Sequence, residues 1–206
     1  MLGKFAGLRL PSDTENTSQW GVYEELAKNR VLFLYGPIIG YGMRQDFFGP
    51  QAITDTLLLL EKRDSFSPIW LIIDSVGGSI PDGLMLYDAI KTTRAPVYTV
   101  GRNCYSMATL ILAAGTLGHR FVYPNSAVML HLPMGSIGGD AEDMDIQNKE
   151  MQKTKLLLVD LLLECGVKKD KKSILKDINR NYWMNADETI MYGLADNKIV
   201  KGALSW

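Results

Sequence analysis

Cysteine and histidine are scarce in this sequence of 206 residues, which contains two of each. Cys104 and Cys165 lie far apart and form no Cys-x-x-Cys pair, and together with His119 and His131 they match no spacing of metal ligands. We therefore expect no metal and no cofactor. Two cysteines in a chain without a secretion signal are typical of reduced thiols, which excludes a disulfide-stabilised scaffold.

Excess charge and long apolar runs are also missing. The 22 basic and 23 acidic residues give a formal net charge of −1, so the charge balance offers no attraction for nucleic acid or an anionic membrane. No stretch approaches about 18 apolar residues, and the first ten residues include Lys4 and Arg9, which fits neither a membrane span nor a signal peptide. These absences predict a globular cytoplasmic protein without a nucleic-acid or membrane partner.

What is present is an alternation of strand and helix patterns, which predicts an α/β fold. Residues 1–18 end in a polar run and are expected to be flexible, whereas 19–206 should form one domain. Strands are predicted at 30–35, 68–74, 97–100, 120–123 and 127–132. Helices are predicted at 23–29, 53–62, 83–92, 107–114 and 141–164. Gly36-Pro37 should end the first strand, Pro124-Asn125 should form a turn between two strands, and Gly115 should cap a helix in the left-handed conformation.

The helix expected at 141–164 is long for so small a domain. At 1.5 Å per residue it would extend about 36 Å. Its second half, 156–163, is apolar nearly all round, and a helix of that kind must be covered by other protein. A partner subunit would provide that cover.

Three local features could carry chemistry, and each has a plainer structural interpretation. Ser106 lies where an apolar strand passes into a helix, so its hydroxyl could serve either as a nucleophile or as an ordinary helix N-cap. His131 ends an alternating strand and could be a base or a structural histidine. Gly77-Gly78 follows a buried strand and could be a simple turn or could offer a backbone N–H to an oxyanion.

Several short motifs give these residues a common context because of the order in which they occur. They are Ser75-Val-Gly-Gly-Ser79, Tyr87-Asp88, Ser106-Met107, Ala114-Gly115, Gly118-x-Arg120-Phe121, Pro124-Asn125-Ser126, Val128-Met-Leu-His131-x-Pro133 and Tyr192-Gly193-Leu194-x-Asp196. This order, which runs from about Trp20 to Ile199, resembles the proteolytic subunit of the Clp protease (the ClpP family). The resemblance implies a ClpP/crotonase-like spiral of repeated ββα units, with a head at 19–132 and 166–200 and a protruding handle at about 133–165.

The resemblance also implies roles for individual residues. Ser106 takes the place of the family's nucleophile and His131 that of its general base. The backbone N–H groups of Gly77 and Met107 would form the oxyanion hole. Such chemistry requires a weak hydroxyl nucleophile, a base that accepts its proton, and fixed donors for the tetrahedral oxyanion.

The sequence departs from the family at the third member of the triad. Aligning Arg180 and Ala186 places Asn181 where the family has an aspartate. An asparagine oxygen can still accept the imidazole Nδ1–H, but a neutral amide cannot offset the charge of an imidazolium. Asp177 and Asp187 are nearby carboxylates that could substitute, although neither falls on the family position.

Other departures affect the surroundings of the site. Tyr105 stands before the serine where the family has a small residue and could crowd the site. Ala108 replaces a glycine, and Val76 replaces the proline of the Ser-Pro-Gly-Gly loop. Trp70 and Ile72 stand where the family has two tyrosines of the pocket that docks the unfoldase.

The resemblance therefore implies an ATP-dependent Clp proteolytic subunit. It would be a slow or conditionally active serine endopeptidase that hydrolyses unfolded polypeptides delivered by an AAA+ unfoldase of the Clp type. Its copies would form heptameric rings and a double-ring barrel, alone or with a ClpP paralogue. Two alternatives stay open: a largely non-catalytic structural subunit of a mixed barrel, and a crotonase-like enzyme acting on acyl-CoA.

Overall fold

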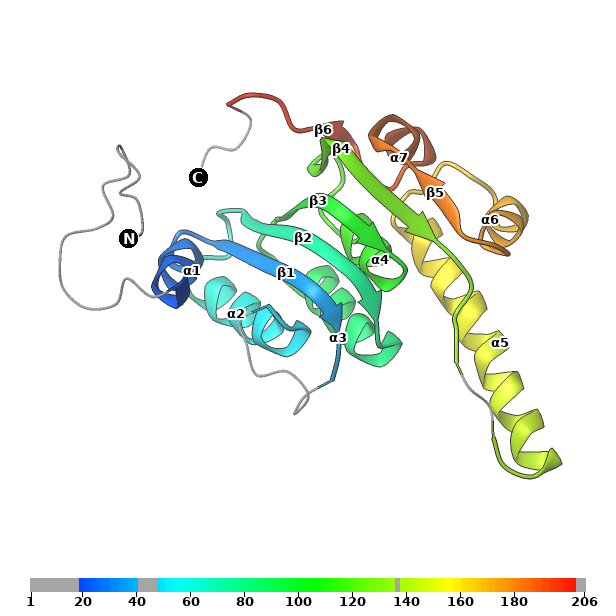
Figure 1. Cartoon of the computed structure of the whole chain (residues 1–206). Coiled ribbons are helices and arrows are strands. Elements are labelled where there is room, and N and C mark those ends of the chain that lie inside the picture. Colours follow the sequence, from blue (N-terminus) through cyan, green and yellow to red (C-terminus); the bar gives the residue numbers. More distant parts are fainter. Residues whose placement is uncertain (1–18, 41–47, 136–137, 203–206) are drawn as a thin grey trace, which may run out of the picture.

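The computed structural model of the chain describes residues 19–40, 48–135 and 138–202 (Figure 1). The segment 1–18, expected to be flexible, lies outside the described residues. The helices are α1 (Gln19–Lys28), α2 (Pro50–Arg63), α3 (Ile80–Thr92), α4 (Met107–Ala113), α5 (Ala141–Glu164), α6 (Lys171–Asp177) and α7 (Ala186–Tyr192). The strands are β1 (Val31–Ile38), β2 (Ile69–Gly78), β3 (Val97–Tyr105), β4 (Arg120–Leu130), β5 (Tyr182–Met184) and β6 (Asn197–Lys198).

The strands form one mixed sheet in the order β1-β2-β3-β4-β5, and β6 pairs with β4. β1 to β4 are parallel, whereas β5 runs antiparallel to β4. Parallel neighbours need a crossover connection, and α2, α3 and α4 provide these connections between successive strands. The α/β fold expected from the alternation of patterns is confirmed.

The two faces of the sheet have different coverings. Leu57, Leu86 and Ile111 of α2, α3 and α4 belong to one large apolar cluster with Ile73 of β2, so these helices cover one face (Figure 1). A smaller cluster on the sheet is rich in aromatic side chains. Its buried members are Val31, Trp70, Ile72, Val100 and Ile199.

The strand predictions were wrong at their ends. β2 continues to Gly78 and β3 to Tyr105, past the ends predicted at 74 and 100. β1 continues through Gly36-Pro37, because a register shift between Tyr35 and Pro37 accommodates the proline, which has no N–H for the ladder. The runs at 120–123 and 127–132 form one strand, β4, and not two strands around a turn. Between the pairs Gly101↔Val122 and Asn103↔Ala127, β4 has three more residues than β3, so Pro124-Asn125 lies in a bulge of a continuous strand.

All five predicted helices exist, but α1, α2 and α3 begin three or four residues before the predicted starts, and α6 and α7 were not predicted. α5 spans Ala141–Glu164, the same residues that the sequence predicts. Gly115, however, is not left-handed: α4 ends at Ala113, Ala114 is the right-handed C-cap, and Gly115 has no positive φ. A Cβ on Gly115 would lie 2.5 Å from Thr99 Oγ1, so the glycine is explained by its close approach to β3.

α5 extends well beyond the rest of the molecule (Figure 1). Val159 and Leu162 are its buried residues, and they join the main apolar cluster. Leu156 and Leu157 remain exposed, at 40% and 46%. The apolar half of the helix is therefore only partly covered by this chain.

Candidate active site

Three predicted catalytic residues lie at one edge of the sheet. Ser106 directly follows β3, His131 directly follows β4, and Asn181 directly precedes β5. Because β3 and β4 are parallel, their carboxyl ends meet at the same edge, and the antiparallel β5 begins there. The sheet thus brings together residues that are distant in the chain.

Ser106 has a backbone conformation that is unusual for a residue with a side chain. Its φ is 58° and its ψ is −125°, and apart from Arg30 it is the one non-glycine residue with positive φ in the described ranges. Its N–H donates to Met129 O at 2.8 Å, which holds the turn against β4. Sterically strained turns of this kind occur at catalytic nucleophiles.

The Ser106 hydroxyl does not act as a helix cap. Ser106 occupies the N-cap position of α4, but its side chain accepts no hydrogen bond from the first turn. The residue is partly buried and its hydroxyl has no hydrogen-bond partner among the described residues. The N-cap interpretation therefore accounts for the position of Ser106 but not for its hydroxyl.

His131 and Asn181 are the residues just beyond the end of the β4–β5 ladder. This antiparallel ladder ends at the pair Leu130↔Tyr182, so the next positions in the same register are His131 and Asn181. Directly opposed residues of antiparallel strands have Cβ atoms about 4.5–5.5 Å apart and side chains on the same face. No hydrogen bond joins the Ser106, His131 and Asn181 side chains within the described part of the chain.

The two carboxylates considered as substitutes for a triad aspartate are engaged elsewhere. Asp177 accepts from Lys169 Nζ at 2.8 Å and from the Tyr192 hydroxyl at 3.2 Å. Asp187 pairs with Lys198 at 2.8 Å. Neither is hydrogen-bonded to His131 in the described part of the chain, so Asn181 stays the candidate for the third position of the triad.

A cavity of about 730 Å³ adjoins this edge of the sheet. Ser106, His131, Gly77 and Met107 all line it, whereas Asn181 does not. Most other lining residues are apolar. The rest of the lining is Pro37, Val76, Gly78, Ser79, Ile80, Pro81, Leu110, Met129, Leu130, Pro133, Met134, Lys155, Leu158, Val159, Leu162 and Ile178.

The backbone at Gly77 packs directly against the turn at Ser106. A Cβ on Gly77 would lie 2.7 Å from Ser106 Cβ and 2.9 Å from Met107 N, and its φ is +81°. Met107 is the first residue of α4, so its N–H has no partner within the helix. The Gly77 N–H, by contrast, donates to Ser75 Oγ at 3.1 Å.

Gly78 is a candidate donor that the sequence analysis missed. Ser79 N–H donates to Ile38 O at 2.7 Å, and N–H groups of successive strand residues point to opposite sides. The Gly78 N–H is therefore directed away from β1, toward the side of β2 on which β3 and Ser106 lie. In the sequence, either glycine of the pair could supply the oxyanion donor. The hydrogen bond from the Gly77 N–H to Ser75 distinguishes them.

A β-bulge in β3, close to Ser106, is linked to β2, the strand that contains Gly77. The register passes from Ile73↔Gly101 to Ser75↔Cys104, so Arg102 and Asn103 of β3 both lie opposite Asp74. Asp74 accepts from Asn103 Nδ2 at 3.0 Å, and Arg102 lies 3.7 Å from its other oxygen. One carboxylate thus links the strand of Ser106 to the strand of the glycine loop.

The sequence suggested that Tyr105 could crowd the site, but its side chain lies outside the cavity. Its hydroxyl donates to Asn103 Oδ1 at 3.3 Å, and its ring makes an edge contact with Trp183 at 5.0 Å between centroids. Tyr105 is absent from the cavity lining, whereas Ser106 belongs to it.

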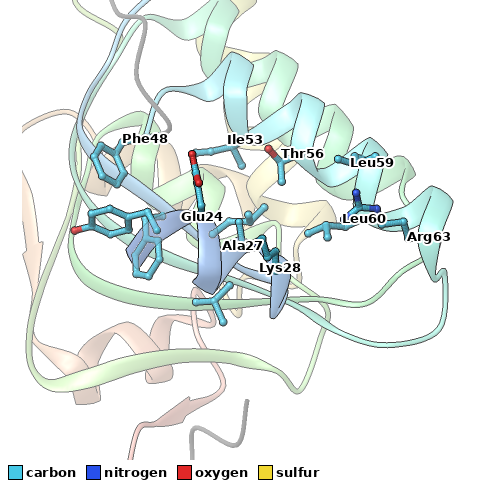
Figure 2. Close-up of a pocket in the computed structure, with 13 residues that line it drawn as sticks. Glu24, Ala27, Lys28, Phe48, Ile53, Thr56, Leu59, Leu60 and Arg63 are labelled. Atoms are coloured by element: carbon cyan, nitrogen blue, oxygen red, sulfur yellow. The ribbon is translucent and has the colours of Figure 1, made fainter. Parts of the chain in front are cut away.

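The two residues assigned to partner docking are buried in the aromatic cluster. Trp70 is 7% exposed and contacts the rings of Tyr98 and Phe121. Ile72 is 4% exposed and lines a hollow of about 470 Å³ together with Tyr35 and other residues. A separate cavity of about 230 Å³ lies between α1, β1 and α2, and neither Trp70 nor Ile72 lines it (Figure 2).

The described residues contain no cluster of three or more histidine, cysteine or carboxylate side chains that could hold a metal ion. Cys104 is fully buried, and this burial raises the pKa of its thiol. Over the same ranges, none of the helices has both the length and the apolar character needed to cross a membrane.

Comparison with known proteins agrees with the motif order. A model of the Clp protease family matches residues 14–202. Similar proteins include the ATP-dependent Clp protease proteolytic subunits of Streptococcus pyogenes serotype M5 (strain Manfredo), serotype M49 (strain NZ131) and serotype M1. Each is 35% identical over 194 residues, which cover 91% of this chain and 95% of the relative.

Proposed function

We propose that this chain, which belongs to the Clp protease family, is a serine endopeptidase subunit that uses Ser106, His131 and Asn181. The observation that carries the proposal is the shared cavity. It is lined by the Ser106 hydroxyl, which does not cap a helix, by the His131 imidazole and by the backbone of Gly77-Gly78. It is large enough for a peptide side chain.

The proposed reaction begins with proton transfer from Ser106 Oγ to His131. The oxygen attacks the scissile carbonyl carbon, and the C=O electrons move to the carbonyl oxygen. We assign the oxyanion donors to the N–H of Met107 and to that of Gly78 in place of Gly77, because Ser75 already accepts the Gly77 N–H. The intermediate then collapses: the C–N bond breaks as His131 protonates the leaving amine, and the acyl-serine remains. In the second step water, deprotonated by His131, attacks the ester; the bond to Ser106 Oγ breaks, and His131 returns the proton to that oxygen.

Asn181 orients the imidazole in this scheme. If its amide oxygen accepts the Nδ1–H of His131, Nε2 is left free to receive the serine proton. The amide carries no charge, so it does not stabilise the imidazolium that forms. We therefore propose a slow peptidase. The hydrogen bonds of its triad would form only in a state other than the isolated chain.

The remaining parts of the proposal concern assembly and location. The exposed Leu156 and Leu157 of α5 support burial against another copy of this chain or a paralogue, in heptameric rings stacked as a barrel. An ATP-driven Clp unfoldase would dock near the aromatic cluster of Trp70 and Ile72 and deliver unfolded protein. The proposed location is the cytoplasm. Fourteen copies of a 23.0 kDa chain would give a particle of about 320 kDa.

The second candidate function is a largely non-catalytic subunit that completes a mixed barrel. The observation that favours it is the absence, among the described residues, of any hydrogen bond joining the three triad side chains. A family match at this level favours either role over the crotonase-like alternative.

Labelling with a fluorophosphonate separates the two candidates, because the reagent needs an activated serine. We expect one adduct per chain at Ser106 in the assembled protein, and none in Ser106→Ala. An assembled particle that takes up no adduct would leave only the structural role. A monomer under several salt conditions would contradict the barrel in either case.

A further inference from the structure

One charged side chain lines the otherwise largely apolar cavity beside Ser106. Among the lining residues, Lys155 is the one aspartate, glutamate, lysine or arginine. It comes from α5 and is partly buried. Its position in the cavity is set by the helix, because it shares one face with Leu158, Val159 and Leu162 at helical spacing. Val159 and Leu162 are the buried anchors of that face.

The Lys155 ammonium has no counter-ion in the described part of the chain. No ion pair or hydrogen bond involves it there. The residues one turn away on α5 are Met151, Gln152, Leu158 and Val159, so the helix itself offers no carboxylate at the positions that could reach it.

Neighbouring lysines behave differently. Lys153 pairs with Glu150 at 2.6 Å, and Lys171 pairs with Asp160 at 2.6 Å. Glu150 and Asp160, the carboxylates of α5 that lie five residues before and after Lys155, are therefore already paired with other lysines. An ammonium that is partly removed from water without a carboxylate partner gains more than an exposed one from an anionic ligand.

We propose that Lys155 is a specificity-determining residue that binds a carboxylate of the peptide held in this cavity. The inference rests on the proposed function, since it assigns a peptide to the cavity. The carboxylate has two possible sources, an acidic side chain or the carboxyl terminus of the peptide. Apolar side chains would contact Leu158, Val159 and Leu162, while the carboxylate meets the ammonium at the edge of that surface.

Equilibrium binding tests the inference without requiring catalysis. The full-length assembled protein carrying Ser106→Ala is titrated with fluorescent apolar peptides that contain one glutamate, or glutamine at the same position, scanned along the sequence. One series has an amidated C-terminus and one a free carboxylate. We expect about tenfold tighter binding of the carboxylate member of at least one pair, with the difference declining as salt is raised.

Charge reversal at the lysine is the decisive comparison. Lys155→Glu should abolish the preference and favour a peptide with lysine over one with glutamine, and Lys155→Met should leave no preference. Lys153→Glu is the matched control, because it makes the same charge change on the same helix at a side chain that is 71% exposed. Lys153→Glu should bind the carboxylate peptide with the same preference as the protein that keeps both lysines.

The outcomes distinguish the two sources of the carboxylate, and they distinguish failure of this inference from failure of the proposed function. A preference seen with amidated peptides assigns the carboxylate to a side chain, and one seen only with free termini assigns it to the chain end. Equal binding of all pairs, or equal effects of Lys155→Glu and Lys153→Glu, overturns the inference. Failure of the proposed function is a different result: no fluorophosphonate adduct at Ser106 in the protein without the alanine substitution.

Discussion

Replacing Asn181 with aspartate restores a negative charge opposite His131 and should accelerate acylation of Ser106. The register of β4 and β5 places positions 131 and 181 opposite each other, so the new carboxylate would lie about 4 Å from the imidazolium. A charge pair at that distance is worth about 1 kcal/mol in water and about 4 kcal/mol at an effective dielectric constant near 20. These energies correspond to rate increases of about fivefold and about a thousandfold.

The exposure of the two residues to solvent sets the size of the rate increase within that range. Asn181 is exposed, whereas His131 is partly buried and lines the cavity. We therefore expect an increase of about 10- to 100-fold in the rate of fluorophosphonate labelling and in peptide hydrolysis. This is smaller than the loss of about 10⁴ caused by the reverse change in a chymotrypsin-type triad, whose aspartate is buried.

The assay compares Asn181→Asp with Asn179→Asp in the assembled protein. Asn179 is also exposed and lies two residues upstream, so it receives the same charge without facing His131. Only the change at 181 should accelerate labelling. If both variants assemble and label at the rate of the unmodified protein, the placement of Asn181 beside the imidazole is refuted.

Three further predictions concern the supports of the site and the core. Gly77→Ala should reduce labelling at least 100-fold and lower the melting temperature, since its Cβ would lie 2.9 Å from Met107 N at a φ of +81°. Asp74→Ala should slow labelling about tenfold by releasing the bulge, with a smaller loss for Asp74→Asn, which keeps an acceptor; equal losses would contradict this reason. Asp196→Asn should cost about 3 kcal/mol in denaturant unfolding, because Arg120, whose side chain is 3% exposed, would lose its bidentate partner. Burial raises the pKa of Asp196, but the Arg120 hydrogen bonds outweigh it and hold the pKa below its ordinary value. The unmodified protein should therefore lose stability as pH falls below about 4, and Asp196→Asn should lose less over that interval.

Long periodic segments were predictable because their pattern is set by local physics. The long helical pattern at 141–164 defined α5 to the residue, and the structure adds an N-cap at Asp140. The strand ends were harder, because pairing with a neighbour can extend a strand past residues that locally favour a turn. β4 runs through Pro124-Asn125 for this reason, and Gly115 is explained by Thr99, which is distant in the chain.

Some residues of the site could likewise be predicted from the sequence, and others could not. The motif order indicated Ser106 and His131, and the register of the sheet explains how they reach one cavity. The use of the Gly77 N–H by Ser75 depends on a side-chain rotamer, which a Gly-Gly pair does not encode. Lys155 was missed because it lies 24 residues beyond His131 on a helix whose docking against the sheet becomes visible only in three dimensions.

An experimental structure of the assembled particle would test the central claim most directly, through the distance from Ser106 Oγ to His131 Nε2. We predict a hydrogen-bonding distance of about 2.6–3.2 Å in at least one state of the particle, with the Asn181 amide oxygen toward the imidazole. Ser106 turned away from His131 in every subunit would contradict the peptidase mechanism.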